Sequence, residues 1–253
     1  MALAAECRPR SGRRDRAAVA ARGRAVILSP ALLAALAVAV AAVAAPAGAT
    51  DEGARAQIDP ASFERQVDNP WYPLKPGTTF VYRGSEDGEP SREVARVTTR
   101  KKTILGVPCV VVSDNVYVGG KLAERTLDWF AQDRKGNVWY FGEATAELDD
   151  EGRVTTTEGS WQAGRDGARP GIVMPGRPRV GQTFRQEYYR GHAEDHFEIV
   201  SLSANVKVPY VSSRGALESR EWSPLEPGLS ERKYYVRGVG LVKDGPAVLV
   251  TVT

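Results

Sequence analysis

Two pairs of side chains in this chain have a spacing that could support chemistry. They are the carboxylates Glu124 and Asp128 and the histidines His192 and His196, each pair four residues apart. On a helix that spacing would place both side chains on one face, as in zinc sites. On a strand it separates them by roughly 13 Å, because a strand rises ~3.3 Å per residue. The chemistry therefore depends on which element carries each pair.

The histidine pair is expected on a strand. Phe197 and Ile199 alternate with Glu198 and Val200, which is the period of a strand. This pattern predicts two surface histidines and no metal site. The other chemical motifs are also weak, since no serine lies in a G-x-S-x-G context. Cys109, in a run of valines, is expected to be a buried small apolar residue.

The carboxylate pair lies in a predicted β-hairpin, the stretch from Leu122 to Glu143 around which the chain is organised. Trp129 and Trp139 flank the turn from Asp133 to Gly136, and Asp at the first and Gly at the fourth position suit a type I turn. A separation of roughly 13 Å on a strand exceeds even the ~6.5–9.5 Å between the carboxyls of inverting glycosidases. No catalytic residue is therefore assigned. A carboxylate-based hydrolase, built on Glu124, Asp128, Glu143 and the group Glu187, Glu194 and Asp195, stays open as an alternative.

One face of this hairpin is predicted to line a cavity. A three-residue loop pairs Asp133 with Asn137, and the polar face of the first strand then lies opposite Tyr140 and the small residues Gly142, Ala144 and Ala146. Polar side chains facing small ones leave space beside them, whereas the alternative is a face in contact with solvent. The predicted ligand-binding residues are Glu124, Thr126, Asp128, Phe130, Gln132, Tyr140 and, from a loop described below, Met174.

The first 49 residues are predicted to be a signal peptide. Seven arginines precede an apolar run from about Ala25 to Ala45, and Ala47-Gly48-Ala49 supplies a cleavage site. Pro30 and the alanine-rich composition argue against a retained membrane anchor. The expected product is secreted or held in the bacterial cell envelope, by the general secretory or the twin-arginine route.

Removal of this leader changes the charge of the protein. The whole chain has a formal net charge of +3, but the residues after Ala49 hold 27 Lys and Arg against 29 Asp and Glu, which gives −2. No basic surface is left to argue for a nucleic-acid partner. Cys109 is the one cysteine after Ala49, so an intramolecular disulfide is excluded.

The mature chain is predicted to be a short disordered spacer (50–60) followed by a single β-rich domain (61–253). From Thr78 onward, β-branched and aromatic residues recur with period two, and turn residues follow about every ten positions. The fold class is therefore all-β, with about ten strands in a strongly curved antiparallel meander or an incomplete barrel. A β-sandwich is the alternative.

The stretch 163–181 breaks this pattern with five glycines and three prolines. A structureless stretch of this length inside a domain is usually functional or disordered. Ile172, Val173 and Met174 give it an apolar centre, so an ordered loop covering the mouth of the cavity is expected.

Several long motifs resemble a family of secreted bacterial β-rich proteins of uncharacterised function. They are NPWYPLKPGTTFVYRG, DWFAQDRKGNVWYFGE, GSWQAGRDGARPGIVMP, RQEYYRGHAED and KYYVRGVGLVK, which together extend over most of the chain from Asn69 to Val242. The resemblance implies one exported β-rich domain and no particular activity.

The function expected from the sequence is non-enzymatic binding of a small molecule, a lipid or a glycan in the concavity of a curved sheet. A structural or interaction module without a small ligand is a further alternative to the hydrolase. We expect a monomer with no cofactor, no nucleic-acid partner and no stable membrane anchor after cleavage.

Overall fold

The structure, a computed structural model, describes residues 58–253 of the chain. The predicted signal peptide (1–49) and most of the predicted spacer (50–60) lie outside these residues, and both remain predictions. Residues 58–253 form no α-helix, and no helix among them is long and apolar enough to cross a membrane. One 3₁₀ turn, Pro60–Ser62, precedes the sheet.

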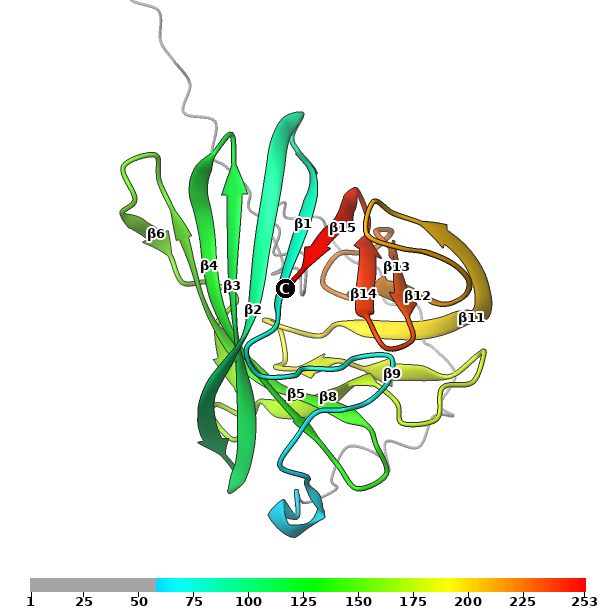
Figure 1. Ribbon diagram of the computed structural model, residues 1–253. Helices are drawn as coiled ribbons and strands as arrows, with labels where there is room; N and C mark the ends of the chain where they lie inside the picture. Colours follow the sequence, from blue (N-terminus) through cyan, green and yellow to red (C-terminus); the bar gives the residue numbers. More distant parts are fainter. Residues whose placement is uncertain (1–57) are drawn as a thin grey trace, which may run out of the picture.

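The domain is built of antiparallel strands (Figure 1). They are β1 (Thr79–Glu86), β2 (Glu89–Ile104), β3 (Val107–Val118), β4 (Lys121–Gln132), β5 (Val138–Leu148), β6 (Val154–Thr156), β7 (Trp161–Gln162), β8 (Arg169–Met174), β9 (Thr183–Arg185), β10 (Glu187–Tyr188), β11 (His196–Lys207), β12 (Ser212–Trp222), β13 (Glu231–Val236), β14 (Gly240–Asp244) and β15 (Ala247–Val252).

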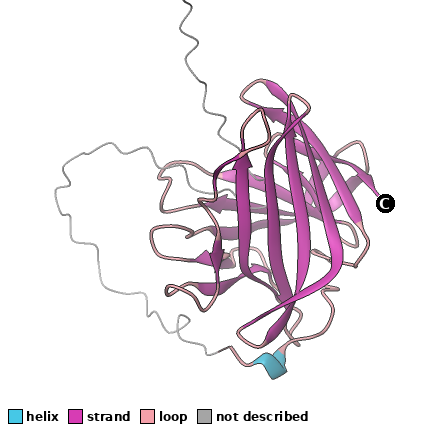
Figure 2. Cartoon of the chain, turned by 90° about the vertical axis from the view of Figure 1, so that its left-hand side faces the viewer, coloured by secondary structure: helices cyan, strands magenta, loops and turns pink. Residues whose placement is uncertain are grey.

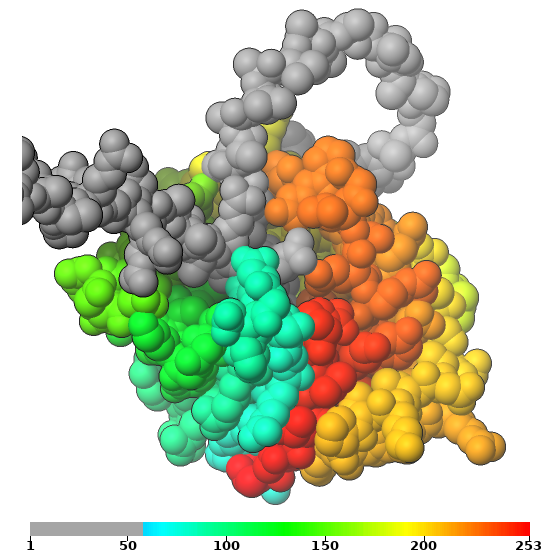
Figure 3. Space-filling view, turned by 90° about the horizontal axis from the view of Figure 1, so that it is seen from above, coloured from blue at the N-terminus to red at the C-terminus, as the bar shows by residue number. Residues whose placement is uncertain are grey.

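These strands form one sheet that curls until it nearly closes. Its order is β10-β8-β5-β4-β3-β2-β1-β15-β14-β13-β12-β11-β9, with β6 and β7 paired to β5. The long strands lie side by side with a strong twist in Figure 2, and Figure 3 shows β1 and β2 next to β15. β9 and β10, the two ends of this order, are separated in sequence only by Gln186. The predicted curved meander or incomplete barrel is confirmed, with fifteen strands instead of about ten.

The central hairpin turn has the predicted geometry. The backbone N–H of Asp133 donates to the carbonyl of Asn137 at 2.9 Å, so the loop has three residues. The Asp133 carboxylate accepts hydrogen bonds from the backbone N–H groups of Lys135 and Asn137 and from the indole N–H of Trp139. Gly136 takes a φ of 83°, the left-handed region in which glycine is favoured. One carboxylate therefore fixes both the turn and an aromatic side chain.

The register beyond this turn differs from the predicted one. A bulge between Asp128 and Phe130 shifts the pairing of β4 with β5, so Glu143, and not Gly142, lies opposite Asp128. The bulge lies at Gly142, whose φ is 121° and whose missing Cβ would overlap the carbonyl oxygen of Trp161 in β7. The predicted row of small residues opposite the polar face was therefore wrong: Glu143 and Thr145 stand there.

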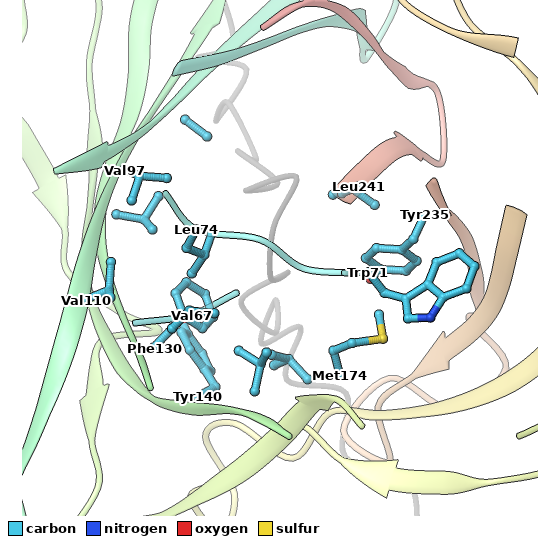
Figure 4. Packing of buried hydrophobic residues seen from close by; sticks show 14 of the residues in the cluster. Val67, Trp71, Leu74, Val97, Val110, Phe130, Tyr140, Met174, Tyr235 and Leu241 are labelled. Carbon is cyan, nitrogen blue, oxygen red and sulfur yellow. The ribbon is translucent and has the colours of Figure 1, made fainter. Parts of the chain in front are cut away.

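An irregular segment between the 3₁₀ turn and β1 closes one end of the barrel. Val67, Trp71 and Leu74 of this segment are buried within the sheet (Figure 4). The side-chain oxygen of Gln132 accepts hydrogen bonds from the backbone N–H groups of Asp68 and Asn69 at 2.9 and 2.7 Å. This segment forms an apolar floor beneath the interior.

The stretch 163–181 is not the continuous cover loop that we predicted. Its centre forms β8, in which Met174 pairs with Val138 and Gly171 with Tyr140 of β5. Met174 is fully buried, as an inward-facing residue, but it belongs to the wall of the barrel. Gly171 is required because a Cβ there would overlap backbone carbonyls at Arg185 and Gln186.

The outer face of the central hairpin is also covered. Trp129 is 4% exposed, and the Lys102 ammonium lies 3.2 Å from the centre of its ring, in cation–π contact. Phe63 packs edge-on against Trp139 and Phe141, with ring centres 6.1 and 5.5 Å away. The hairpin is therefore packed on both sides, which predicts that its register is strongly fixed.

The bulge gives a test of this register. Gly142→Ala places a Cβ against β7 and forces a side-chain-bearing residue into positive φ, so we expect a loss of about 1–3 kcal/mol or more in unfolding free energy. Gly215→Ala in β12 is the matched control, because its Cβ would meet open space. Urea denaturation measures both, and equal stabilities of the two variants would contradict the bulge.

Candidate functional site

Carboxyl groups are concentrated on the inner face of the barrel. Seven acidic side chains there are at least 96% buried, and Lys233 is the only buried basic residue among residues 58–253. We call these seven the inner carboxyls: Glu93, Asp114, Glu124, Asp128, Glu143, Glu187 and Asp244. Buried charges are costly unless they are paired, so the partners of these groups determine what the site can do.

The upper part of β4 carries a small hydrogen-bond network. The hydroxyl of Thr126 is 2.9 Å from Oε1 of Glu124 and 2.8 Å from the hydroxyl of Thr145, which itself lies 3.2 Å from the same Glu124 oxygen. The second oxygen of Glu124, Oε2, has no hydrogen-bond partner. Burial raises the pKa of Glu124 to about 7.

Asp128, four residues after Glu124 on β4, is held by a contact to the neighbouring strand β5. Tyr140 of β5 donates its hydroxyl to Oδ1 of Asp128 at 2.9 Å, while Oδ2 of Asp128 is buried without a partner. Glu143 lies directly opposite Asp128 in the sheet. Burial raises the pKa of Asp128 well above its usual range, and the nearby Asp114 and Glu124 carboxyls raise it further.

Glu93 in β2 and Asp114 in β3 form a second pair of neighbouring carboxyls. All four of their oxygens are buried, and apart from the hydrogen bond that the two carboxyls can share they have no side-chain partner in the part of the chain that the structure describes. Burial, and then the charge of Asp114, raise the pKa of Glu93 well above its usual range. Two such carboxyls are stable side by side when one carries a proton or when a cation lies between them.

The opposite wall, from β12 to β14, is neutralised internally. The Lys233 ammonium lies 2.9 Å from Oε2 of Glu221 and 3.1 Å from Oδ2 of Asp244. Asp244 and Glu221 keep the pKa of Lys233 well above its usual range, against the effect of burial. Lys233 is therefore charged, and its charge is shared by two carboxylates of its own wall.

An apolar layer lies below the carboxyls. Phe130 and Tyr140 stack with ring centres 4.9 Å apart, and Tyr72 from the floor segment packs against Phe130 at 5.5 Å. Figure 4 shows Phe130 and Tyr140 on one side of this layer and Tyr235 and Met174 on the other. The interior therefore has an aromatic base and an acidic upper part.

Two small hollows lie within the fold, and a larger groove lies beside Trp129 on the outer face of the hairpin. A hollow of about 30 Å³ is bordered by Tyr72, Tyr82 and Phe130, and one of about 50 Å³ by Asp195, Glu221 and Lys233. Each has room for a few water molecules. The groove measures about 320 Å³ and is lined by Lys102, Trp129, Glu143, Ala144, Ser160, Trp161, Gln162, Arg165, Asp166, Ala168 and Tyr189.

The structure brings the predicted ligand-binding residues together on one wall but gives them different roles. Glu124, Thr126 and Asp128 belong to the acidic upper part, as described above. Gln132 instead holds the floor segment through its hydrogen bonds to Asp68 and Asn69. The remaining three, Phe130, Tyr140 and Met174, are fully buried packing residues, although the Tyr140 hydroxyl also binds Asp128.

Sequence reasoning missed three of the inner carboxyls, Glu93, Asp114 and Asp244, together with Lys233. It considered Glu143 and Glu187 only for the alternative hydrolase. A signal for one of the missed carboxyls is present, because Asp114 lies two residues from both Val112 and Val116, which share its face of the strand. An acidic residue in register with inward-facing valines indicates an inward-facing carboxyl.

The other candidate side chains lie away from this site. His192 stacks on Tyr189, and His196 stacks on Trp222 and accepts a hydrogen bond from the Arg185 side chain at 3.0 Å. Burial raises the pKa of the Cys109 thiol to about 12, so the thiol is unreactive at neutral pH. No group of three or more His, Cys, Asp and Glu within residues 58–253 is arranged to hold a metal ion.

Comparisons with protein-family models, curated proteins and solved structures find no match to this chain. The resemblance noted in the sequence motifs therefore remains a prediction. The function has to be argued from the interior itself.

The raised pKa of Glu124 predicts how stability depends on pH. The Glu124 carboxyl has a higher pKa in the folded protein than in the unfolded chain. Between about pH 4.5 and about pH 7 only the unfolded chain has lost this proton, so the free energy of unfolding falls as pH rises through that range. For Glu124 this loss is on the order of 3 kcal/mol. Glu124→Gln should remove it, which urea denaturation at pH 4.5 and 7.5 measures.

Glu89→Gln is the control for this experiment, since Glu89 is an exposed residue at the start of β2. The control should retain the pH dependence of the unmodified protein. If the stability of Glu124→Gln falls by as much between the two pH values as that of the unmodified protein, Glu124 is in contact with water and the buried site described here is wrong.

Proposed function

We propose that this protein is an exported β-barrel that binds a small molecule, a lipid or a glycan in its interior without converting it chemically. The observation that carries the proposal is the set of buried carboxyl oxygens that have no hydrogen-bond partner among residues 58–253. Five of the seven inner carboxyls, Glu93, Asp114, Glu124, Asp128 and Glu187, have at least one such oxygen.

These groups reduce the stability of the empty barrel. A buried polar atom without a partner costs about 1–3 kcal/mol, and more if it is charged. Apolar side chains of similar volume would pack the same interior more stably. Sequences depart from stable packing mainly at functional sites, and buried ionisable groups with raised pKa values are typical of such sites.

The layered interior favours a ligand that has both a polar and an apolar part. Phe130, Tyr72 and Tyr140 offer apolar and aromatic surface, and the carboxyls above them offer hydrogen-bond acceptors. Small-molecule sites commonly combine a mainly apolar lining with a few convergent polar groups.

Export follows from the predicted leader, whose cleavage would leave the β-domain free in the cell envelope or outside the cell. This part of the proposal rests on the sequence of residues 1–49, which lie outside the described residues. A small molecule acquired during export or from the surroundings would then be the natural ligand.

Native mass spectrometry of the mature protein from its own host tests the proposal. We expect a mass above that of the polypeptide, which collision activation reduces to the bare mass. Asp128→Asn should lose most of this excess, because its carboxyl faces the interior, whereas the exposed-site control Glu89→Gln should keep it. A bare mass for the unmodified protein, or equal retention by Asp128→Asn, would contradict interior binding.

A hydrolase is the second candidate because Asp128 and Glu143 lie directly opposite each other on β4 and β5. The Cβ atoms of opposed residues are about 4.5–5.5 Å apart, so the two carboxyls can reach the ~5–5.5 Å separation found in retaining glycosidases. This pair replaces Glu124 and Asp128, which the sequence brought into consideration.

Chromogenic glycosides, assayed with the unmodified protein and with Asp128→Asn and Glu143→Gln, distinguish the two candidates. Turnover that falls at least ~100-fold in both variants would identify a glycosidase and overturn the non-enzymatic proposal. No turnover, with the host molecule retained, is the result that the proposal predicts.

A further inference from the structure

We infer that the interior ligand is an organic cation whose ammonium group is held at Asp114, the centre of a group of four carboxyls on adjacent strands. We call these four the acidic wall: Glu93, Asp114, Glu124 and Asp128. The inference rests on the proposed function, since it names the chemical class of the ligand that the interior would take.

The sheet register brings the acidic wall together. Asp114 lies opposite Thr126 on β4, and Glu124 and Asp128 are the inward-facing residues on either side of Thr126. On the other flank Asp114 lies opposite Ala95 of β2, and Glu93 is the next inward-facing residue of that strand. Diagonal neighbours on one face of a sheet are about 7–8 Å apart, so an ammonium group beside Asp114 can also reach a carboxyl on a neighbouring strand. Glu124 and Asp128, four residues apart on β4, are separated by roughly 13 Å and do not meet at one point.

Most carboxyl oxygens of the acidic wall lack a hydrogen-bond donor. Six of its eight carboxyl oxygens are buried and lack a partner in the described part of the chain. These include both oxygens of Glu93 and of Asp114, together with Oε2 of Glu124 and Oδ2 of Asp128. Carboxylate oxygens are acceptors, so they are completed either by a proton on one of two neighbouring carboxyls, as between Glu93 and Asp114, or by an outside donor. An ammonium group supplies three N–H donors and the positive charge that Asp114 and a neighbouring carboxylate need.

The opposite wall shows how this interior accommodates an ammonium group. There the Lys233 Nζ atom lies between Glu221 and Asp244, 2.9 and 3.1 Å from the nearest oxygen of each. No Lys or Arg side chain within residues 58–253 forms a comparable ion pair with the acidic wall. The ammonium group of a ligand would therefore neutralise carboxylates of the acidic wall, as the Lys233 ammonium neutralises Glu221 and Asp244 on the opposite side of the barrel.

The aromatic layer below the wall favours an organic cation over a metal ion. Tyr72 lies close enough to Asp128 that the Asp128 charge contributes to raising the Tyr72 pKa. Phe130 and Tyr140 lie on the same inner face as Asp128, and ammonium groups are attracted to the faces of such rings. The spacing of the wall does not bring three ligating groups around a single metal ion within residues 58–253. A cation with an apolar tail would fit both layers.

Isothermal titration calorimetry at pH 8 with hexylammonium, hexanol and hexanoate tests the inference. These probes share one alkyl chain and differ in the charge of the head group. We expect hexylammonium to bind the mature protein and the other two to bind at least ~10-fold more weakly, since a factor of ten corresponds to one well-placed charge-assisted contact. Asp114→Asn and Asp128→Asn should each weaken hexylammonium binding by ~10-fold or more, whereas Glu89→Gln should not.

Each other outcome overturns the inference. Equal binding of hexanol or hexanoate would show that the site does not select a cation, and unchanged affinity in both Asn variants would place the cation elsewhere. If hexylammonium does not bind although the host-derived molecule is retained in native mass spectrometry, the cationic class is wrong and the proposed function stands. A bare mass in that experiment would overturn both. Circular dichroism of the variants establishes that each is folded.

Discussion

The cost of keeping carboxyl groups out of water governs the rest of this structure. In a sheet that nearly closes, every second side chain points inward. On six of the strands at least one of these inward-facing side chains is acidic. Lys233 compensates Glu221 and Asp244 on one wall, but Glu93, Asp114, Glu124 and Asp128 have no comparable basic partner among residues 58–253. The barrel therefore has a stable base and an upper interior whose charges require protons or a ligand.

The remainder of the fold makes that arrangement possible. Trp129 and Phe141 pack on the outside of the hairpin, so much of the apolar stabilisation of β4 and β5 comes from their outer face. The floor segment, fixed by Gln132, adds apolar contacts inside the lower part of the barrel. The bulge at Gly142 then places a second carboxyl, Glu143, opposite Asp128. Stability and the candidate site thus occupy different layers of the same strands.

Local patterns in the sequence predicted the local features of this fold. Asp133 and Gly136 were enough to predict the hairpin turn, and period-two alternation predicted an all-β curved sheet. The bulge could not be predicted, because it depends on Gly142 meeting Trp161 of a strand that pairs only in the folded chain. For the same reason a glycine-rich stretch was expected to be a cover loop, although its pairing with β5 makes it a strand. Alternation also fails to show which face of the first half of β3 is inward, since this strand carries buried residues on both faces from Cys109 to Val112.

Carboxyl-carbon NMR of the mature protein, labelled with ¹³C at the side-chain carboxyls of Asp and Glu, tests the central claim directly. The inner carboxyls are expected to titrate well above the usual range near ~4, with Glu124 at a pH of about 7. Added hexylammonium should move the midpoints of the acidic wall downward, because a bound cation favours the ionised form. Midpoints near ~4 for Glu93, Asp114, Glu124 and Asp128 in the free protein would show that water reaches them and would contradict the account.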